Sequence, residues 1–174
     1  MRYIFLAFAF GALSCSSNRY FIVRHGEKVV ITKDSAGMMA NNPPLSEPGK
    51  VRAFVLRDEL KSEKISYIYS TNYLRTINTA QPLRDAVPGA VFKLYSPSKD
   101  SLDAFVAQLK AIKKGNVLIV GHSNTVDDIV NKLCERTEVN GDLKDSEYDN
   151  MFIVKRKGSK WIFSRKKYGY PSNP

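Results

Sequence analysis

The sequence predicts a single α/β domain, a three-layer sandwich in which helices flank a mostly parallel central sheet. Three observations predict this fold. Apolar segments of strand length alternate with longer segments in which apolar residues recur every three or four positions. The strand-like segments are nearly continuous in aliphatic residues, which is typical of strands buried on both faces. The chain has 174 residues, 43% of them hydrophobic, which is enough for one domain with its own core.

The first half of the domain is expected to contain three strands and two helices. The segments with strand composition are residues 20–23, 65–69 and 90–95. A helix is expected after each of the first two. Ser46 is placed to cap the first helix, Pro48 lies in its first turn, and its predicted apolar stripe is Val51, Phe54, Val55 and Leu60. The second helix starts at about Tyr73 and is expected to be distorted near Pro82.

The second half repeats the alternation and ends differently. A helix capped by Asp100-Ser101 carries a regular apolar stripe made of Leu102, Phe105, Val106, Leu109 and Ile112. Residues 117–120 form the strongest strand, and a further helix runs from Val126 to Leu133. After a polar loop over residues 135–150, residues 151–154 and 161–163 predict an antiparallel C-terminal hairpin around Gly158.

The first 19 residues are expected to lie outside the domain. Residues 3–13 are an apolar run of 11 residues, which is too short for a bilayer span and typical of a signal peptide. The small residues before Cys15 resemble a bacterial lipoprotein signal, in which the cysteine is lipidated and becomes the new N-terminus. We therefore expect a signal peptide over 1–14, lipidated Cys15 and a linker over 15–19, and the domain over 20–174. An ordinary secretory signal is the alternative. The lipoprotein interpretation predicts an exported protein of the bacterial cell envelope, attached to a membrane through its lipid anchor.

The formal net charge is +10, but it is unevenly distributed. The last 24 residues contain no Asp or Glu and carry seven basic residues. These are Lys155, Arg156, Lys157, Lys160, Arg165, Lys166 and Lys167. A solvated basic edge is favoured over a nucleic-acid groove, because no recognition motif accompanies the charge. We therefore expect no nucleic-acid partner, and one hypothesis is that this basic tail meets anionic lipid headgroups.

Counts of cysteine and histidine restrict the chemistry. Two cysteines exclude a disulfide framework or a multi-cysteine zinc site, and Cys134 is expected to be a buried thiol. Only two histidines are present, His25 and His122, which argues against a histidine-rich metal site. Each is adjacent to a glycine and follows a predicted strand.

Basic residues follow three of the predicted strands. Arg24 and His25 follow the first, Arg75 comes shortly after the second, and His122 follows the fourth. Ligands of open α/β sheets bind beyond the carboxyl ends of the strands, so these side chains are expected to share one site. Two guanidiniums and the adjoining helix N-termini favour a tetrahedral oxyanion. Taken singly, each residue is as readily a surface ion-pair partner or a helix cap.

Four segments together resemble the histidine phosphatase superfamily, which has the phosphoglycerate-mutase-like fold. Val23 to Lys28, with the sequence VRHGEK, is similar to its first signature. Ser70 to Thr76, followed by Thr79-Ala80, resembles its second block with one additional residue between the Ser and the Arg. Residues 120–125 resemble the third block, and Leu45-Ser46-x-x-Gly49 resembles the element that precedes the first long helix.

The resemblance implies roles for four residues. His25 would be the nucleophile that becomes phosphorylated, His122 would join it in catalysis, and Arg24 and Arg75 would bind the phosphoryl group. The family needs no metal and no cofactor for this chemistry. A neutral imidazole is nucleophilic at neutral pH, and the surrounding cations stabilise charge on the transferred phosphoryl group.

The residue that protonates the leaving group is less well defined. Relatives take it from a Glu in an insertion after the second block, or from an Asp directly after the second histidine. This chain has Ser123 at the latter position and no Glu in residues 86–100. Glu27 is the first candidate, with Asp100 and Asp103 as others. Glu27 is equally suited to orienting an arginine.

The predicted function is metal-independent hydrolysis of small phosphomonoesters through a phosphohistidine intermediate. The chain has little room for the large lid insertions of mutases or phytases, which favours hydrolysis. Two alternatives stay open: a protein phosphohistidine phosphatase and a non-catalytic phosphate-ester-binding lipoprotein.

Overall fold

The computed structural model describes residues 18–31 and 41–172 and contains a mixed six-stranded sheet in the order β3-β2-β4-β1-β5-β6. The strands in chain order are β1 (Arg19–Arg24), β2 (Ile65–Ser70), β3 (Val91–Leu94), β4 (Asn116–Gly121), β5 (Asn150–Lys157) and β6 (Lys160–Lys167). The first four are parallel, whereas β5 and β6 form an antiparallel hairpin beside β1. The predicted fold class is therefore confirmed, including the C-terminal hairpin.

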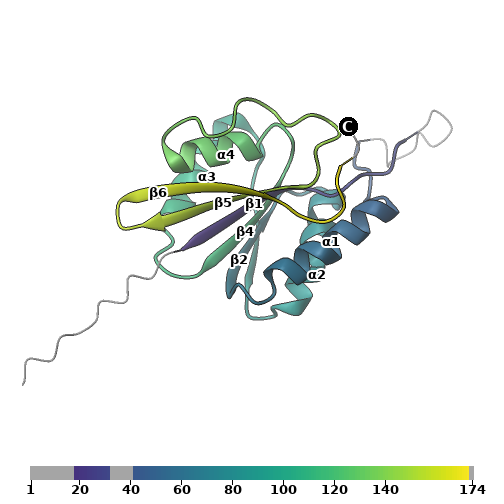
Figure 1. Ribbon diagram of the computed structural model, residues 1–174, viewed down its shortest axis with the longest axis horizontal. Coiled ribbons are helices and arrows are strands. Elements are labelled where there is room, and N and C mark those ends of the chain that lie inside the picture. The colour runs from purple at the N-terminus through teal and green to yellow at the C-terminus, as the bar shows by residue number, and fades with distance from the viewer. Residues whose placement is uncertain (1–17, 32–40, 173–174) are drawn as a thin grey trace, which may run out of the picture.

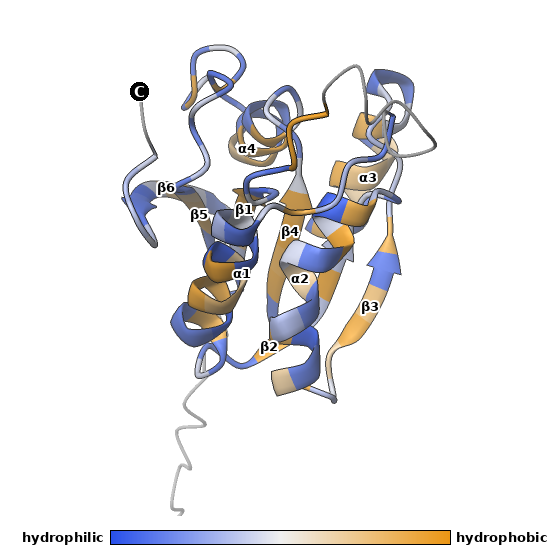
Figure 2. Ribbon diagram, turned by 90° about the vertical axis from the view of Figure 1, so that its right-hand side faces the viewer, coloured by the Kyte–Doolittle hydropathy of each residue, from blue (hydrophilic) through white to orange (hydrophobic). Residues whose placement is uncertain are grey.

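Two helices cover each face of the sheet (Figure 1). They are α1 (Glu47–Leu60) and α2 (Leu74–Ala86) on one face, and α3 (Lys99–Lys110) and α4 (Val126–Cys134) on the other. Because side chains alternate along a strand, each central strand contributes to two cores. On β4, for example, Ile119 packs toward α3 and α4, and Leu118 packs toward α1 and α2. Figure 2 shows β4 hydrophobic along most of its length, as a strand buried on both faces requires.

Most of the predicted elements occur where the sequence placed them, with small shifts at their ends. The cap of α1 is confirmed, since the backbone N–H of Gly49 donates to the Ser46 hydroxyl at 3.4 Å. Helix α3 begins at Lys99 with Ser98 as its N-cap, rather than at the predicted Asp100-Ser101. Cys134 is buried as predicted, and burial raises the pKa of its thiol to about 11.

The predicted inward face of α1 is wrong at two positions. Val51 and Phe54 are 45% and 50% exposed, and the residues that α1 buries include Arg52, Ala53 and Leu56. Compared with the predicted orientation, α1 presents Arg52 to the interior, where its guanidinium donates hydrogen bonds to the Glu27 carboxylate. A hydrophobicity pattern does not detect this, since it counts arginine as an outward-facing residue.

Residues 1–17, 32–40 and 173–174 lie outside the described part of the chain. The predicted signal peptide and Cys15 fall among them, so the lipid anchor and the envelope location stay predictions. Within the ranges 18–31 and 41–172, no helix has the length and apolar character needed to cross a bilayer.

Candidate active site

The four basic residues singled out by sequence meet at the carboxyl edge of the sheet. Strands β2, β4 and β1 are neighbours, so the segments that follow them lie side by side. Nε of Arg75 lies 3.2 Å from Nε2 of His25, and Nη2 of Arg75 lies 3.5 Å from Nδ1 of His122. The two imidazole ring centres are 5.4 Å apart. Together with Arg24, these side chains line one cavity of about 300 Å³.

His25 is held with one ring nitrogen available for chemistry. Its Nδ1 lies 2.7 Å from the carbonyl oxygen of Gly26. A carbonyl only accepts hydrogen bonds, so Nδ1 carries the proton and Nε2 keeps a lone pair. Burial lowers the pKa of His25 to about 3, and the positive charges of Arg24 and Arg75 act in the same direction. The imidazole is therefore neutral, as a nitrogen nucleophile has to be.

The backbone around His25 is fixed by close packing against α1 and α2. The backbone N–H of Gly26 donates to the hydroxyl of Thr79 at 2.9 Å, and that of Ser46 donates to the carbonyl of Glu27 at the same distance. A Cβ on Gly49 would lie 2.1 Å from the Glu27 carbonyl oxygen. Glycine at position 49 therefore allows the start of α1 to lie directly against the loop that follows His25.

A hydrogen-bond chain orients His122. The Thr76 hydroxyl donates to the carbonyls of Thr71 and Tyr73, so it accepts from the Thr71 hydroxyl. Thr71 then accepts from Nε2 of His122, 2.9 Å away. This leaves Nδ1 of His122 unprotonated and facing Arg75. Burial and the charges of Arg75 and Arg24 lower the pKa of His122 to about 4.

Arg24 is buried and is hydrogen-bonded to the loop before β5. Its Nη1 donates to the carbonyls of Lys144 at 2.8 Å and Asp145 at 3.1 Å. Its guanidinium lies 4.0 Å from the ring centre of Tyr148, whose ring centre is in turn 6.0 Å from that of His25. Nε of Arg24 is buried and has no hydrogen-bond partner among the described residues. The guanidinium is thus positioned by the loop and keeps one donor unused.

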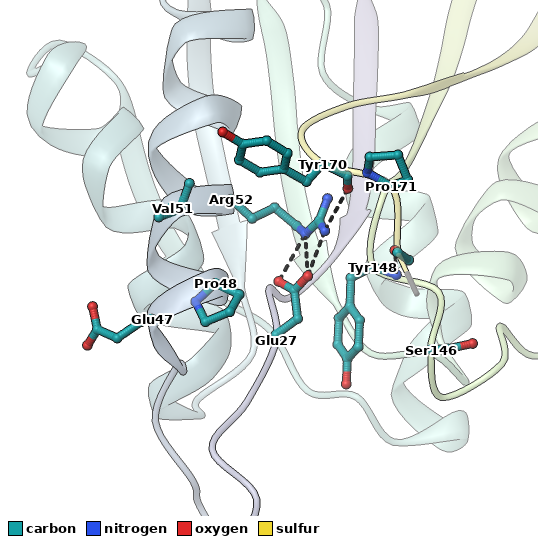
Figure 3. Close-up of a pocket in the computed structure, with 10 residues that line it drawn as sticks. Glu27, Glu47, Pro48, Val51, Arg52, Ser146, Tyr148, Tyr170 and Pro171 are labelled. Carbon is teal, nitrogen blue, oxygen red and sulfur yellow. Dashed lines mark hydrogen bonds and ion pairs between the residues drawn. The ribbon is translucent and has the colours of Figure 1, made fainter. Parts of the chain in front are cut away.

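None of the three carboxyls proposed from sequence as proton donors lines this cavity. The Glu27 carboxylate receives hydrogen bonds from Nε and Nη2 of Arg52, and it lines a different cavity of about 610 Å³, which Tyr148 also lines (Figure 3). Asp103 is ion-paired with Lys132, and Asp100 lies exposed in the first turn of α3. The structure therefore separates these three residues from the histidines.

Three residues that the sequence did not single out lie at the cavity. Tyr73 lies edge-on to His122, with ring centres 5.1 Å apart, and its ring lies under the guanidinium of Arg75. Asp145 lines the cavity and places a carboxylate oxygen 3.7 Å from Nη2 of Arg24. Tyr148 stacks on Arg24. Tyr73 belongs to the second sequence block, whereas the loop that carries Asp145 and Tyr148 offers no motif.

The two buried histidines predict how stability depends on pH. Each has a lower pKa in the folded state than the ordinary value of 6.5, so the unfolded chain binds more protons below pH 6.5. The free energy of unfolding is therefore expected to fall as the pH drops from 6.5 toward 4. In His25→Gln this fall should be smaller, as measured by denaturant titration at several pH values. An unchanged pH slope in the variant would show that His25 is not a buried neutral imidazole.

Comparison with known proteins supports the same family. Residues 20–94 match the Histidine phosphatase superfamily (branch 1), the family that the sequence motifs resemble. Among curated proteins, none matches the sequence. Similar solved structures include a protein assigned as the phosphohistidine phosphatase SixA of Agrobacterium tumefaciens, with a TM-score of 0.61 and 17% identity. That alignment covers 88% of this chain and 99% of the other.

Two further structures have the same fold. A mycobacterial glucosyl-3-phosphoglycerate phosphatase aligns with a TM-score of 0.61 at 15% identity, covering 84% of this chain and 97% of the other. A protein assigned as an alpha-ribazole-5'-P phosphatase from Escherichia coli aligns with a TM-score of 0.63 at 13% identity, covering 86% and 96%. At these identities the structural likeness establishes the shared fold.

Proposed function

We propose that this chain, which matches the histidine phosphatase superfamily over residues 20–94, is a member of that family and a phosphomonoester hydrolase that forms a covalent phosphohistidine on His25. The family match and the fold support a phosphatase acting on a small phosphorylated substrate. One observation carries the mechanism. The neutral imidazole of His25 lies beside His122 in an open, positively charged cavity, and its unprotonated Nε2 accepts a hydrogen bond from Nε of Arg75.

In the first step, Nε2 of His25 attacks phosphorus, the P–N bond forms and the P–O bond to the leaving group breaks. The Nδ1–H of His25 remains bonded to the Gly26 carbonyl, which stabilises the positive charge that develops on the ring. The guanidiniums of Arg24 and Arg75 stabilise charge on the equatorial phosphoryl oxygens. Water then attacks the phosphohistidine, which releases phosphate and regenerates the neutral imidazole.

His122 changes its role when the anion binds. In the free site its Nδ1 accepts from Arg75. A phosphate dianion nearby raises the pKa of an imidazole, because it favours the charged form. His122 is then able to take up a proton and donate through Nδ1 to a phosphoryl oxygen. The Thr71 hydroxyl, which accepts from Nε2, keeps the ring in the required orientation.

Substrates whose leaving groups differ in their need for a proton test this function. Among the described residues, Asp145 is the carboxyl that lines this cavity, and its oxygen lies 3.7 Å from Nη2 of Arg24. A positioned proton donor increases the rate at which an alkoxide leaves by about 100-fold or more. Without one, kcat/KM for an aryl phosphate such as p-nitrophenyl phosphate is expected to exceed that for an alkyl phosphate by about 100-fold. The activity is expected to be the same with and without a chelator.

The variants Asp145→Asn and Glu27→Gln serve as the comparison in this assay. An unchanged aryl-to-alkyl ratio in both is the expected result. If alkyl phosphates are hydrolysed as well as aryl phosphates and one variant abolishes that, the altered residue is the proton donor. If the folded protein hydrolyses no phosphomonoester at all, the site binds phosphate esters without turnover.

A protein phosphohistidine phosphatase is the second candidate. Nε2 of His25 lies in an open cavity beside the loop that carries Asp145, so a phosphorylated side chain on another protein has access to it. In that case a phosphohistidine-bearing protein should be dephosphorylated faster than p-nitrophenyl phosphate at equal concentration.

A further inference from the structure

The chain enters the domain at the end of the sheet opposite to the histidines. Asn18 immediately precedes β1, which runs from Arg19 to Arg24 beside the active site. Six residues of strand separate the two ends by about 20 Å. The entry point is fixed, because the side chain of Asn18 donates to the carbonyl of Ile112 at 2.7 Å and its own carbonyl accepts from the backbone N–H of Arg156 at 3.0 Å.

Exposed lysines surround this entry point. Strand register places them, since β1, β2 and β4 begin at this end and β5 ends there (Figure 1). One lysine precedes β2, two precede β4, one lies opposite Arg19 on β5, and two flank the hairpin turn. They are Lys64, Lys113, Lys114, Lys155, Lys157 and Lys160, which we call the entry-face lysines.

The positive charge of this face is not neutralised within the described residues. None of the entry-face lysines forms an ion pair with another described residue. Three acidic residues near this end are already engaged in ion pairs. Glu63 is paired with Arg19, Glu135 with Lys110, and Asp58 with Lys61.

The hypothesis drawn from the sequence has the whole basic C-terminal tail meeting anionic lipid headgroups. In the structure, the basic residues of this tail do not lie on one surface. Arg165 is hydrogen-bonded to Asn150, Lys166 is paired with Glu59, and Lys167 is paired with Asp149. Asn150 and Lys167 are opposite each other in the hairpin, at the end nearer the active site. The unpaired charge of the tail therefore belongs to the entry face, together with lysines from elsewhere in the chain.

We propose that the entry-face lysines bind the anionic headgroups of a membrane, so that the histidine cavity faces away from the bilayer. Lipid is favoured over nucleic acid because of what precedes Asn18. Cys15 is three residues upstream, a span of at most about 11 Å, and the apolar segment 3–13 comes before it. A lipid on Cys15 would hold Asn18, around which these lysines lie, within about one Debye length of the headgroups, where the attraction is least screened.

Vesicle binding tests this orientation directly. The full chain carrying Cys15→Ser, so that no acyl chain contributes, is mixed with phosphatidylcholine vesicles that contain or lack phosphatidylglycerol. The test variant adds Lys114→Gln and Lys157→Gln. The matched control adds Lys93→Gln and Lys99→Gln, which are exposed lysines on β3 and α3 with the same total charge change.

The expected result is tighter binding to the anionic vesicles, with the test variant weakened about thirtyfold and the control weakened less than about twofold. Both variants should keep the phosphatase activity of the parent on a soluble substrate. Equal losses in both variants, or no preference for anionic vesicles, would overturn the proposal. So would tighter binding of a DNA duplex than of vesicles with the same lysine dependence. The experiment measures binding, so its result is independent of whether the protein is a phosphatase.

Discussion

Replacing His25 with alanine is expected to lower kcat/KM for p-nitrophenyl phosphate by about 10⁴-fold or more. The substitution removes Nε2, the one atom positioned to attack phosphorus, and the remaining cations have no nucleophile to assist. Water in the same cavity is a poor replacement, because covalent catalysis divides one difficult displacement into two easier ones. The measurement is steady-state hydrolysis by purified protein, with a chelator present throughout.

Loss of structure has to be separated from loss of chemistry in this variant. His25 is buried, so the free energy of unfolding of His25→Ala is measured alongside the activity. A folded variant without activity supports nucleophilic catalysis. A folded variant that keeps more than about a tenth of the activity would exclude His25 as the nucleophile.

Replacing Arg75 with alanine is expected to lower kcat/KM by about 10³-fold. Arg75 is the only residue within hydrogen-bonding distance of both histidines among those described, with its guanidinium 3.2 Å from His25 and 3.5 Å from His122. It is only half-buried, so its removal should affect the reaction more than the fold. The kcat/KM of Arg75→Lys is expected to lie between those of the wild type and Arg75→Ala, since an ammonium keeps the charge but not the planar pair of donors.

Arg84→Ala is the matched control for this prediction. Arg84 lies on the same helix, α2, is exposed, and stacks on Phe92 away from the cavity. The Arg84 variant should keep wild-type kcat/KM. If Arg75→Ala behaves like Arg84→Ala, then Arg75 does not stabilise the transferred phosphoryl group.

The sequence was sufficient to predict the strands and the residues that follow them. Continuous aliphatic runs such as residues 117–120 have few alternatives to a strand buried on both faces. Once the strands are parallel, topology brings Arg24, His25, Arg75 and His122 to one edge. That convergence follows from strand direction and needs no information about side-chain packing.

Contacts between residues distant in sequence were not predictable in the same way. Arg52 is buried because it binds Glu27 and the carbonyl of Tyr168, a contact that spans 116 residues. That ion pair lies on the inward side of α1, and Glu27 lines a different cavity from the histidines. The loop that carries Asp145 and Tyr148 reaches the site because Arg24 binds its carbonyls. Backbone acceptors leave no trace in the sequence, so this rim of the site was visible only in the structure.

A covalent bond between phosphorus and Nε2 of His25 defines the mechanism, and trapping of the phosphoenzyme in an alkaline denaturant tests it most directly. Wild-type protein is mixed with excess aryl phosphate, quenched within the first turnovers, and analysed by mass spectrometry of its peptides. We expect one phosphoryl group on the peptide that contains His25, labile in acid, stable in base, and absent from His25→Ala. Turnover without any phosphorylated His25 peptide, or a phosphoryl group on another residue, would contradict the mechanism.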